Sequence, residues 1–202
     1  DFGCGEGHVA QKISTLETKL SYGFDVAKTG SLNWETPENN FLLTTEFEKI
    51  KENAPYDVVL LYDVLDHATD PVDVLKKVRE LTEGNSKIFV RCHPYSARHS
   101  THQYRKCNKA YIQLIFTEEE LASLNLTNDI KQKTFFPVDA NNKWFSASGF
   151  KVVSHDTVKT VVEDFFKNNA VVKSRIMRKE FAKSFPEHQM SQVFNDYILQ
   201  KI

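Results

Sequence analysis

Short apolar runs alternate with segments of helical apolar spacing over the first 90 residues. The strongest strand pattern is 56–63, because its unbroken apolar run Val58–Leu61 suits a strand that is covered on both faces. Val9, Ile13 and Leu16 recur at helical spacing, and Asp70-Pro71 is typical of a helix start. The pattern predicts strands over 22–26, 41–45, 56–63 and 87–92, and helices over 8–16, 46–53 and 71–81. Alternation of this kind predicts a doubly wound α/β fold with a mostly parallel sheet.

The C-terminal half gives a different pattern. Thr117 followed by Glu120 resembles a capping box and predicts a helix start, whereas 125–142 is polar and predicts no element. One late strand is expected over 149–154, followed by helices over 157–168, 170–185 and 187–202, the last two separated by Pro186. We therefore expect a sheet domain over 1–154 and a helical C-terminal extension over 155–202 packed on it.

A glycine-rich turn opens the chain, with Gly3, Gly5 and Gly7 placed between Asp1 and the first helix. Glycines allow a ligand to approach bare backbone, and the amide groups at the helix start then face that ligand. The acid at the base of the turn suits an ammonium group better than a phosphate. The dinucleotide fingerprint needs a third glycine where His8 stands, so a nicotinamide cofactor is not expected.

A second acid, Asp25, ends the next predicted strand, 18 residues after Gly7. A carboxylate at the carboxyl end of this strand would accept hydrogen bonds from both hydroxyls of a ribose. The turn, the helix and this acid together are a stronger signal for a ligand site than a glycine turn alone.

Three segments, 1–7, 22–26 and 56–67, together with Asp70-Pro71, resemble the class I S-adenosylmethionine-dependent methyltransferases. The form Asp-Val-Leu-acid-His at 63–67 is similar to the branch that is rich in small-molecule methyltransferases. The resemblance is specific over residues 1 to about 92. It implies a Rossmann-like methyltransferase fold and S-adenosyl-L-methionine as the cofactor.

The resemblance also implies which residues border the cofactor. The glycine turn would line the methionine part, Asp25 the ribose and Val26 one face of the adenine. Residues after the strand predicted over 41–45 would lie near the adenine edge, although Glu46-Phe47 departs from the commoner pair of an acid and a small residue. The expected cofactor-binding residues are Asp1, Gly3, Cys4, Gly5, Asp25, Val26, Glu46, Phe47, Tyr62, Asp63 and His67.

The segment 93–102 follows the strand predicted over 87–92, so it should lie at the carboxyl edge of the sheet, where ligands bind in this fold class. His93, Tyr95 and Arg98 are expected to bind an anionic or polar acceptor, and His99 or His102 to act as the base. No metal site is expected, because this segment contains no carboxylate.

The absence of two known motifs narrows the class of methyl acceptor. Residues 62–65 do not have the Asp-Pro-Pro-Tyr form of exocyclic-amino DNA methyltransferases, and no Pro-Cys pair supports attack on cytosine carbon 5. A small-molecule acceptor methylated on oxygen or nitrogen is therefore favoured over nucleic acid. Two alternatives stay open. The first is a catalytically silent cofactor-binding module. The second is aminopropyl transfer from decarboxylated S-adenosylmethionine, which the presence of Asp1 disfavours.

Charge and composition exclude other classes of partner. Lys and Arg number 26 and Asp and Glu 27, so the formal net charge of −1 gives no overall field for nucleic acid or an acidic membrane. The apolar runs are far shorter than the ~20 residues that a membrane-spanning helix needs. Three irregularly spaced cysteines and no secretory pattern predict a cytoplasmic protein with reduced thiols. The oligomeric state is not predicted.

The resemblance places a central strand before the acid of the glycine motif, and Asp1 is that acid. A sheet without this strand would lack ladder hydrogen bonds on both neighbouring strands. We therefore expect residues before Asp1 in the natural protein. The alternative is a circular permutation in which 197–202 returns as that strand.

Overall fold

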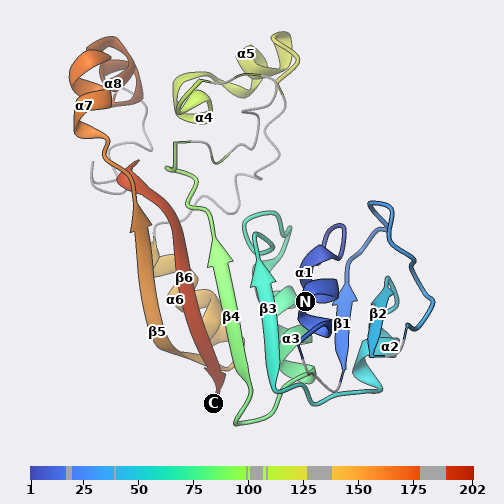
Figure 1. Ribbon diagram of the computed structural model, residues 1–202. Helices are drawn as coiled ribbons and strands as arrows, with labels where there is room; N and C mark the ends of the chain where they lie inside the picture. The colour runs from blue at the N-terminus through green and yellow to red at the C-terminus, as the bar shows by residue number, and fades with distance from the viewer. Residues whose placement is uncertain are drawn as a thin grey trace.

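The computed structural model describes residues 1–16, 20–38, 40–98, 100, 107, 109–126, 138–177 and 190–202. Strands β1 (Ser21–Phe24) and β2 (Phe41–Thr44) form a parallel pair. A second sheet has the order β3-β4-β6-β5 (Figure 1), with β3 (Val58–Tyr62) parallel to β4 (Lys87–Cys92). Strand β6 (Gln192–Lys201) lies antiparallel between β4 and β5 (Phe150–Lys159).

The two sheets are connected through the first residues of the chain. Phe2 forms an isolated parallel bridge with Phe24 of β1, and its amide donates to the carbonyl oxygen of Leu60 in β3 at 2.9 Å. The N-terminus accordingly lies between β1 and β3 (Figure 1). The glycine turn therefore starts from the middle of the sheet.

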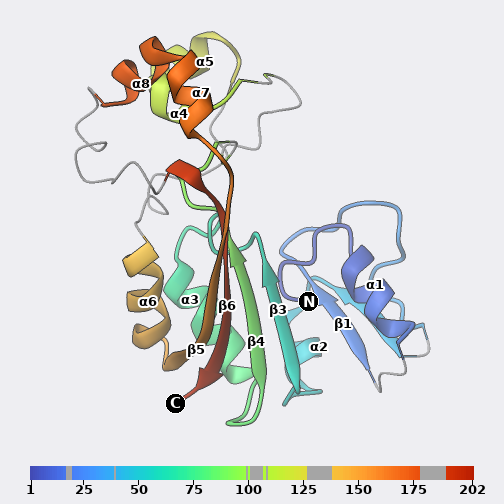
Figure 2. The same cartoon turned by 60° about the vertical axis from the view of Figure 1, so that its left-hand side comes forward.

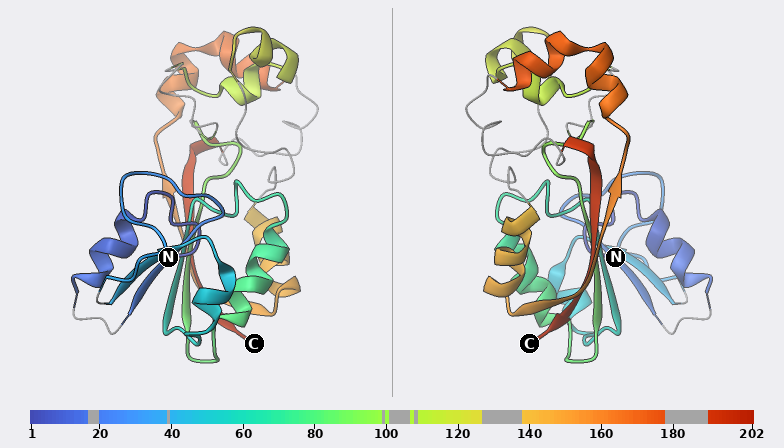
Figure 3. Two further views of the ribbon diagram at one scale, coloured as in Figure 1. Left: turned by 90° about the vertical axis from the view of Figure 1, so that its right-hand side faces the viewer. Right: turned by 90° about the vertical axis from the view of Figure 1, so that its left-hand side faces the viewer.

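Helices cover the sheet on both sides (Figure 3). Helices α3 (Pro71–Glu80) and α6 (Val138–Ala147) lie on one side, and α1 (His8–Ser14) packs against β1 and β2 on the other. Alternate side chains of the central strands are buried, as two-residue strand periodicity requires. The main core includes Val59, Leu61, Leu65, Leu75, Val78, Ile88, Val90, Phe145, Phe150, Tyr197 and Leu199.

The predicted elements of the first 92 residues are confirmed, with no boundary shifted by more than two residues. The strand predicted over 87–92 matches β4, and α2 (Phe47–Lys51) lies inside the helix predicted over 46–53. Asp70 caps α3 by accepting hydrogen bonds from the amides of Val72 and Asp73. Thr117 and Glu120 form the predicted capping box of α5 (Glu118–Ser123). The Rossmann-like α/β fold is confirmed, with an antiparallel half formed by β5 and β6.

The helix predicted over 187–202 is wrong, because residues 192–201 form strand β6. The apolar side chains of Phe194, Tyr197 and Ile198 recur at helical spacing, and polar Asn195 hides the strand alternation. In the fold, Asn195 is buried and its Oδ1 accepts from Thr157 Oγ1 of β5 at 2.8 Å. Cross-strand pairing satisfies this polar group, an interaction that a local pattern cannot reveal.

The helix predicted to begin at 157 is also displaced. β5 continues to Lys159, past the expected domain boundary at 154, and α7 (Glu163–Asn168) starts later. The alternative in which 197–202 fills the place before Asp1 is wrong, since β6 pairs with β4 and β5 instead. Sequence analysis also missed α6, which begins inside the polar stretch 125–142.

A group of short helices, here called the cap, lies beyond the carboxyl ends of β3 and β4 (Figure 2). The cap consists of α4 (Ile112–Ile115), α5, α7 and α8 (Ala170–Met177). Its core contains Tyr95, Tyr111, Leu114, Val162, Phe166, Ile176 and Met190. Within the described ranges, the chain has no helix whose length and apolar character would allow it to cross a bilayer.

Candidate functional site

The glycine turn has the backbone conformation that its sequence predicts. Gly3, Gly5 and Gly7 have φ angles of 78°, 53° and 81°, in the left-handed region that favours glycine. The amides of Gly3 and Cys4 both donate to the carbonyl oxygen of Phe24, at 2.7 and 3.0 Å. A Cβ on Gly3 would lie 2.4 Å from Val64 Cγ2, whereas a Cβ on Gly5 would meet nothing within 4 Å. The backbone at Gly5 therefore borders open space.

Asp25 links the end of β1 to this turn. Its Oδ2 accepts from the Gly5 amide at 2.8 Å, and its Oδ1 accepts from the Val26 amide at 2.7 Å. Each carboxylate oxygen keeps a further lone pair for a ligand. Val26 beside it is 88% exposed, so its side chain is open to a ligand. This arrangement fits a nucleoside whose ribose binds Asp25 and whose base covers Val26.

Cys4 and Phe47 are both partly buried and pack against core side chains. Burial, reinforced by the Asp25 carboxylate, raises the pKa of the Cys4 thiol to about 11, so the thiol is protonated at neutral pH. The Phe47 ring packs edge-on against Phe2 and Phe24, with centroids 6.4 and 6.0 Å apart. Both residues therefore lie beside the predicted cofactor region, and Phe47 also anchors α2 to the core.

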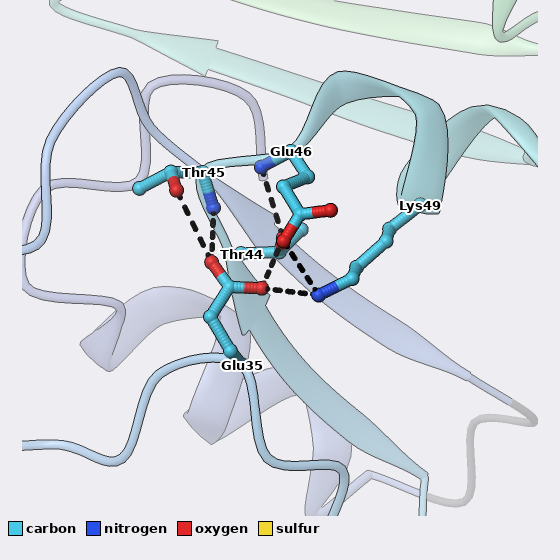
Figure 4. Close-up of polar contacts among 5 residues, drawn as sticks. All are labelled: Glu35, Thr44, Thr45, Glu46 and Lys49. Atoms are coloured by element: carbon cyan, nitrogen blue, oxygen red, sulfur yellow. Dashed lines mark hydrogen bonds and ion pairs between the residues drawn. The ribbon is translucent and has the colours of Figure 1, made fainter.

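Glu35 was not predicted as a site residue. It projects from the loop before β2 into a polar cluster with Thr44, Thr45, Glu46 and Lys49, called the Glu35 cluster below (Figure 4). Its Oε2 accepts from Thr44 Oγ1 at 2.7 Å and from Lys49 Nζ at 2.8 Å, and its Oε1 accepts from the Thr45 amide at 2.8 Å. The sequence gives no signal for Glu35, because its partners converge only when the loop folds back over β2.

Burial by itself raises the pKa of Glu35, but the hydrogen bonds from Lys49, Thr45 and Thr44 outweigh it and lower the pKa to about 2. A depressed carboxyl pKa stabilises the fold above the unfolded-state value of 4.5, and this stabilisation is lost as pH falls toward 2. We expect Glu35→Gln to lower the free energy of unfolding by about 1–2 kcal/mol at pH 7, allowing for solvent screening.

Urea unfolding of the wild type and Glu35→Gln at pH 7, 4.5, 3.5 and 2.5 measures this difference. The two proteins should converge in stability at the lowest pH. Glu38→Gln, at an exposed side chain of the same loop, is the matched control. A stability gap between wild type and Glu35→Gln that stays constant down to pH 2.5 would contradict the assignment.

Four acidic and imidazole groups gather where β3 and β4 end. Asp63 has a left-handed φ of 58°, and Asp66 is only 3% exposed. Burial raises the pKa of Asp66, and the charge of Asp63 acts in the same direction. His67 Nε2 lies 4.0 Å from Asp66 Oδ2, and Asp66 Oδ1 has no hydrogen-bond partner in the described part of the chain. Val64 in this turn touches Gly3, so the turn borders the glycine motif.

His93 bridges this group and β6. Its Nδ1 lies 2.9 Å from the Val193 carbonyl oxygen, and its Nε2 lies 3.3 Å from Asp63 Oδ1. Burial lowers the pKa of His93, but the Asp63 and Asp66 carboxylates outweigh it, so that the pKa is raised. Acceptors at both ring nitrogens favour the imidazolium form. The predicted contact of His93 with the acceptor stays a prediction.

Residues that follow β4 lead into the cap. Tyr95 is buried in the cap core and donates from its hydroxyl to the Gln113 carbonyl oxygen at 3.3 Å. The Arg98 guanidinium lies 5.0 Å from the centre of the Phe165 ring, and its Nε is buried without a hydrogen-bond partner among the residues described. His99 and His102, the predicted bases, lie outside the described residues.

The structure therefore brings most of the predicted site to one edge of the sheet. Asp25, Glu46 and Asp63 follow β1, β2 and β3 at the carboxyl ends of these strands, with the glycine turn between β1 and β3. Tyr62, the last residue of β3, is instead in register with Arg91 of β4. The Arg91 guanidinium carbon lies 5.4 Å from the centre of the Tyr62 ring. Across the ranges that the structure describes, no three His, Cys, Asp or Glu side chains form a group able to hold a metal ion.

Comparison with known families gives a match over residues 1–155 to a family model described as "Methyltransferase domain". Among curated relatives, a ubiquinone biosynthesis O-methyltransferase of Pseudoalteromonas translucida is 28% identical over 161 residues, 75% of this chain and 62% of that protein. A tRNA U34 carboxymethyltransferase of Campylobacter fetus is 26% identical over 45% of this chain and 34% of that protein. The chain thus spans about three-fifths of the first of these relatives and a third of the second.

Solved structures agree on the fold. A methyltransferase from Archaeoglobus fulgidus superimposes with a TM-score of 0.55 at 14% identity, covering 100% of this chain and 84% of that chain. The plantazolicin methyltransferase, solved with S-adenosylhomocysteine, gives 0.51 at 15% identity over 99% and 75% of the two chains. The match over residues 1–155 confirms the predicted family resemblance, and the solved structures confirm the predicted Rossmann-like fold.

Proposed function

The chain belongs to the methyltransferase-domain family, and we propose that it transfers a methyl group from S-adenosylmethionine to an oxygen or nitrogen atom of a small anionic acceptor. The observation that supports an anionic acceptor is the state of Arg98. Its Nε is buried and has no hydrogen-bond partner in the described residues, and its guanidinium lies over the Phe165 ring. A guanidinium pairs with carboxylates and phosphates through parallel hydrogen bonds. An anionic group on the acceptor would supply those bonds.

S-adenosylmethionine, when bound, supplies a methyl group on a positively charged sulfur, which a nucleophilic oxygen or nitrogen can accept. The open backbone face at Gly5 would receive its amino-acid part, and the Asp25 carboxylate would accept from the ribose hydroxyls. Exposed Val26 would cover one face of the adenine. The buried Asp66 carboxyl at the end of β3, when ionised, favours positive charge nearby, in keeping with a sulfonium.

Gln113 of α4 supports an acceptor site on the side of the cap that contacts the segment after β4. Its Nε2 donates to the carbonyl oxygens of Tyr95 and Ala97, at 2.9 and 2.7 Å, which fixes the orientation of the amide. Its Oε1 is buried and has no partner in the described residues. Arg98 therefore offers an unused donor and Gln113 an unused acceptor on neighbouring elements. A molecule with both an acidic group and a hydroxyl would satisfy both.

Oxygen is the favoured methylated atom, since several similar curated proteins are ubiquinone biosynthesis O-methyltransferases. His99 and His102, which come after β4 in the sequence, remain the proposed bases. The decisive assay uses S-adenosylmethionine with a tritiated methyl group and three acceptors: 3,4-dihydroxybenzoate, catechol and bulk tRNA. Label transfer to the benzoate above catechol supports the proposal, whereas transfer to tRNA alone, or to none of the three, contradicts it.

Arg98→Gln tests the anion contact. We expect kcat/KM for 3,4-dihydroxybenzoate to fall about 30-fold, because a charge-assisted pair is lost, while catechol methylation changes little. Arg175→Gln is the matched control, since Arg175 forms an exposed ion pair with Glu120 in the same cap. Equal losses on the two acceptors would show that Arg98 supports the fold of the cap and not the recognition of an anion.

A further inference from the structure

The Glu35 cluster lies beside the proposed ribose site, at the end of the neighbouring strand β2. Phe24 of β1 is in register with Thr44 of β2, and the Asp25 amide donates to the Thr44 carbonyl oxygen at 3.3 Å. A nucleoside with its ribose at Asp25 would therefore extend its base toward residues 45–47. This inference rests on the proposed cofactor site, because it concerns the part of the ligand next to the ribose.

The cluster has one cation between two carboxylates. Lys49 Nζ lies 2.8 Å from Glu35 Oε2 and 2.8 Å from Glu46 Oε1 (Figure 4). Glu35 uses both of its oxygens inside the cluster, through Thr44, Thr45 and Lys49. Glu46 Oε2, by contrast, accepts no hydrogen bond from the described residues, and the Glu46 side chain is 59% exposed. One negative charge thus remains in surplus, and it lies on Glu46.

Glu35 itself is held in an unfavourable backbone conformation. Its φ is 62°, in the left-handed region that costs a non-glycine residue about 1–2 kcal/mol. Its amide donates to the Leu43 carbonyl oxygen at 2.7 Å, which fixes the loop against β2. The carboxylate is therefore aimed at Lys49 by a rigid segment and not by a freely rotating surface side chain.

We propose that Glu35 is a positioning residue for adenine recognition: it neutralises Lys49, so that Glu46 Oε2 stays available to accept from the exocyclic amine of the adenine. Without the Glu35 charge, Lys49 has Glu46 as its remaining carboxylate partner in the cluster. The ammonium then competes with the base for Glu46, and the cluster loses its surplus negative charge. Adenine would no longer be distinguished from a base that lacks the amine.

The test compares S-adenosylhomocysteine with S-inosylhomocysteine, in which a carbonyl oxygen replaces the exocyclic amine. Titration calorimetry on the whole chain should give wild-type protein about tenfold tighter binding of the adenine compound, the factor for one hydrogen bond to a charged group. In Glu35→Gln this preference should fall below about twofold. Glu48→Gln, at an exposed acid on α2, should keep the wild-type preference.

A rescue variant separates this role from a purely structural one. Glu35→Gln combined with Lys49→Met removes the competing ammonium, so the preference for adenine should return even though stability does not. Glu35→Gly, which suits the left-handed backbone, carries the same test if Glu35→Gln fails to fold. An unchanged preference in Glu35→Gln or Glu35→Gly, or no recovery in the double variant, overturns the inference. Wild-type protein that binds neither compound overturns the cofactor site as well.

Discussion

Replacing Gly3 by Ala is expected to lower the free energy of unfolding by about 3 kcal/mol. About 1–2 kcal/mol comes from placing an L side chain at a φ of 78°, and the rest from overpacking, since the new Cβ would lie 2.4 Å from Val64 Cγ2. Val64 follows β3 closely and belongs to the turn that holds Asp63 and Asp66. The substitution should therefore displace the end of β3 as well as the glycine turn. Urea unfolding, monitored by circular dichroism, measures the loss of unfolding free energy.

Gly5→Ala and Gly84→Ala are the matched controls for Gly3→Ala. Gly5 has a φ of 53°, but the space that a methyl group would occupy there is open, so its replacement should cost only the conformational part, about 1–2 kcal/mol. Gly84 has neither a left-handed φ nor a neighbour within 4 Å, and its replacement should change stability by less than about 0.5 kcal/mol. Equal losses at Gly3 and Gly5 would show that contact with Val64 is unimportant.

The parallel half of the fold could be predicted because its signals are local. The apolar run 58–61, the Asp70-Pro71 helix start and the glycine turn each specify their element within a few residues. The antiparallel half depends on long-range pairing. Asn195 of β6 is satisfied by Thr157 and His155 of β5, nearly 40 residues away, so the sequence around it looks helical on its own. Tertiary pairing thus overrides local periodicity in β6.

The candidate site divides in the same way between residues with local signals and residues that only folding brings together. Asp25 could be predicted because it follows a strand at a fixed distance from a recognisable turn, and the structure adds its bonds to Gly5 and Val26. Glu35 could not, since loop folding alone brings it to Lys49 and Thr45. Asp66 reads in the sequence as one acid of a polar turn, and its burial emerges only when the turn packs under His93.

Asp25→Ala is expected to raise the Kd for S-adenosylhomocysteine about 100-fold. Two contributions add. The ribose loses an ionised acceptor, and the Gly5 amide loses the Asp25 Oδ2 atom, 2.8 Å away, that holds the glycine turn in place. The Kd of Asp25→Asn should lie between those of the wild type and Asp25→Ala. The asparagine side chain has one acceptor oxygen for the two backbone N–H groups of Gly5 and Val26, and its NH₂ group would face the second of them. Titration calorimetry at pH 7.5 gives the three constants directly.

Asp73→Ala provides the comparison for Asp25→Ala, since Asp73 is an exposed acid on α3 whose ion pair with Lys77 lies on the helix surface. Its Kd should stay within about twofold of the wild type, and the melting temperature of each variant shows whether the fold persists. Should Asp25→Ala bind S-adenosylhomocysteine within threefold of the wild type while Gly5→Ala loses binding, the ribose contact would be excluded and the backbone at Gly5 would carry the affinity. If Asp25→Ala loses binding of S-adenosylhomocysteine while Asp25→Asn retains it, one neutral acceptor is sufficient, because the side-chain amide oxygen alone then accepts from the ribose.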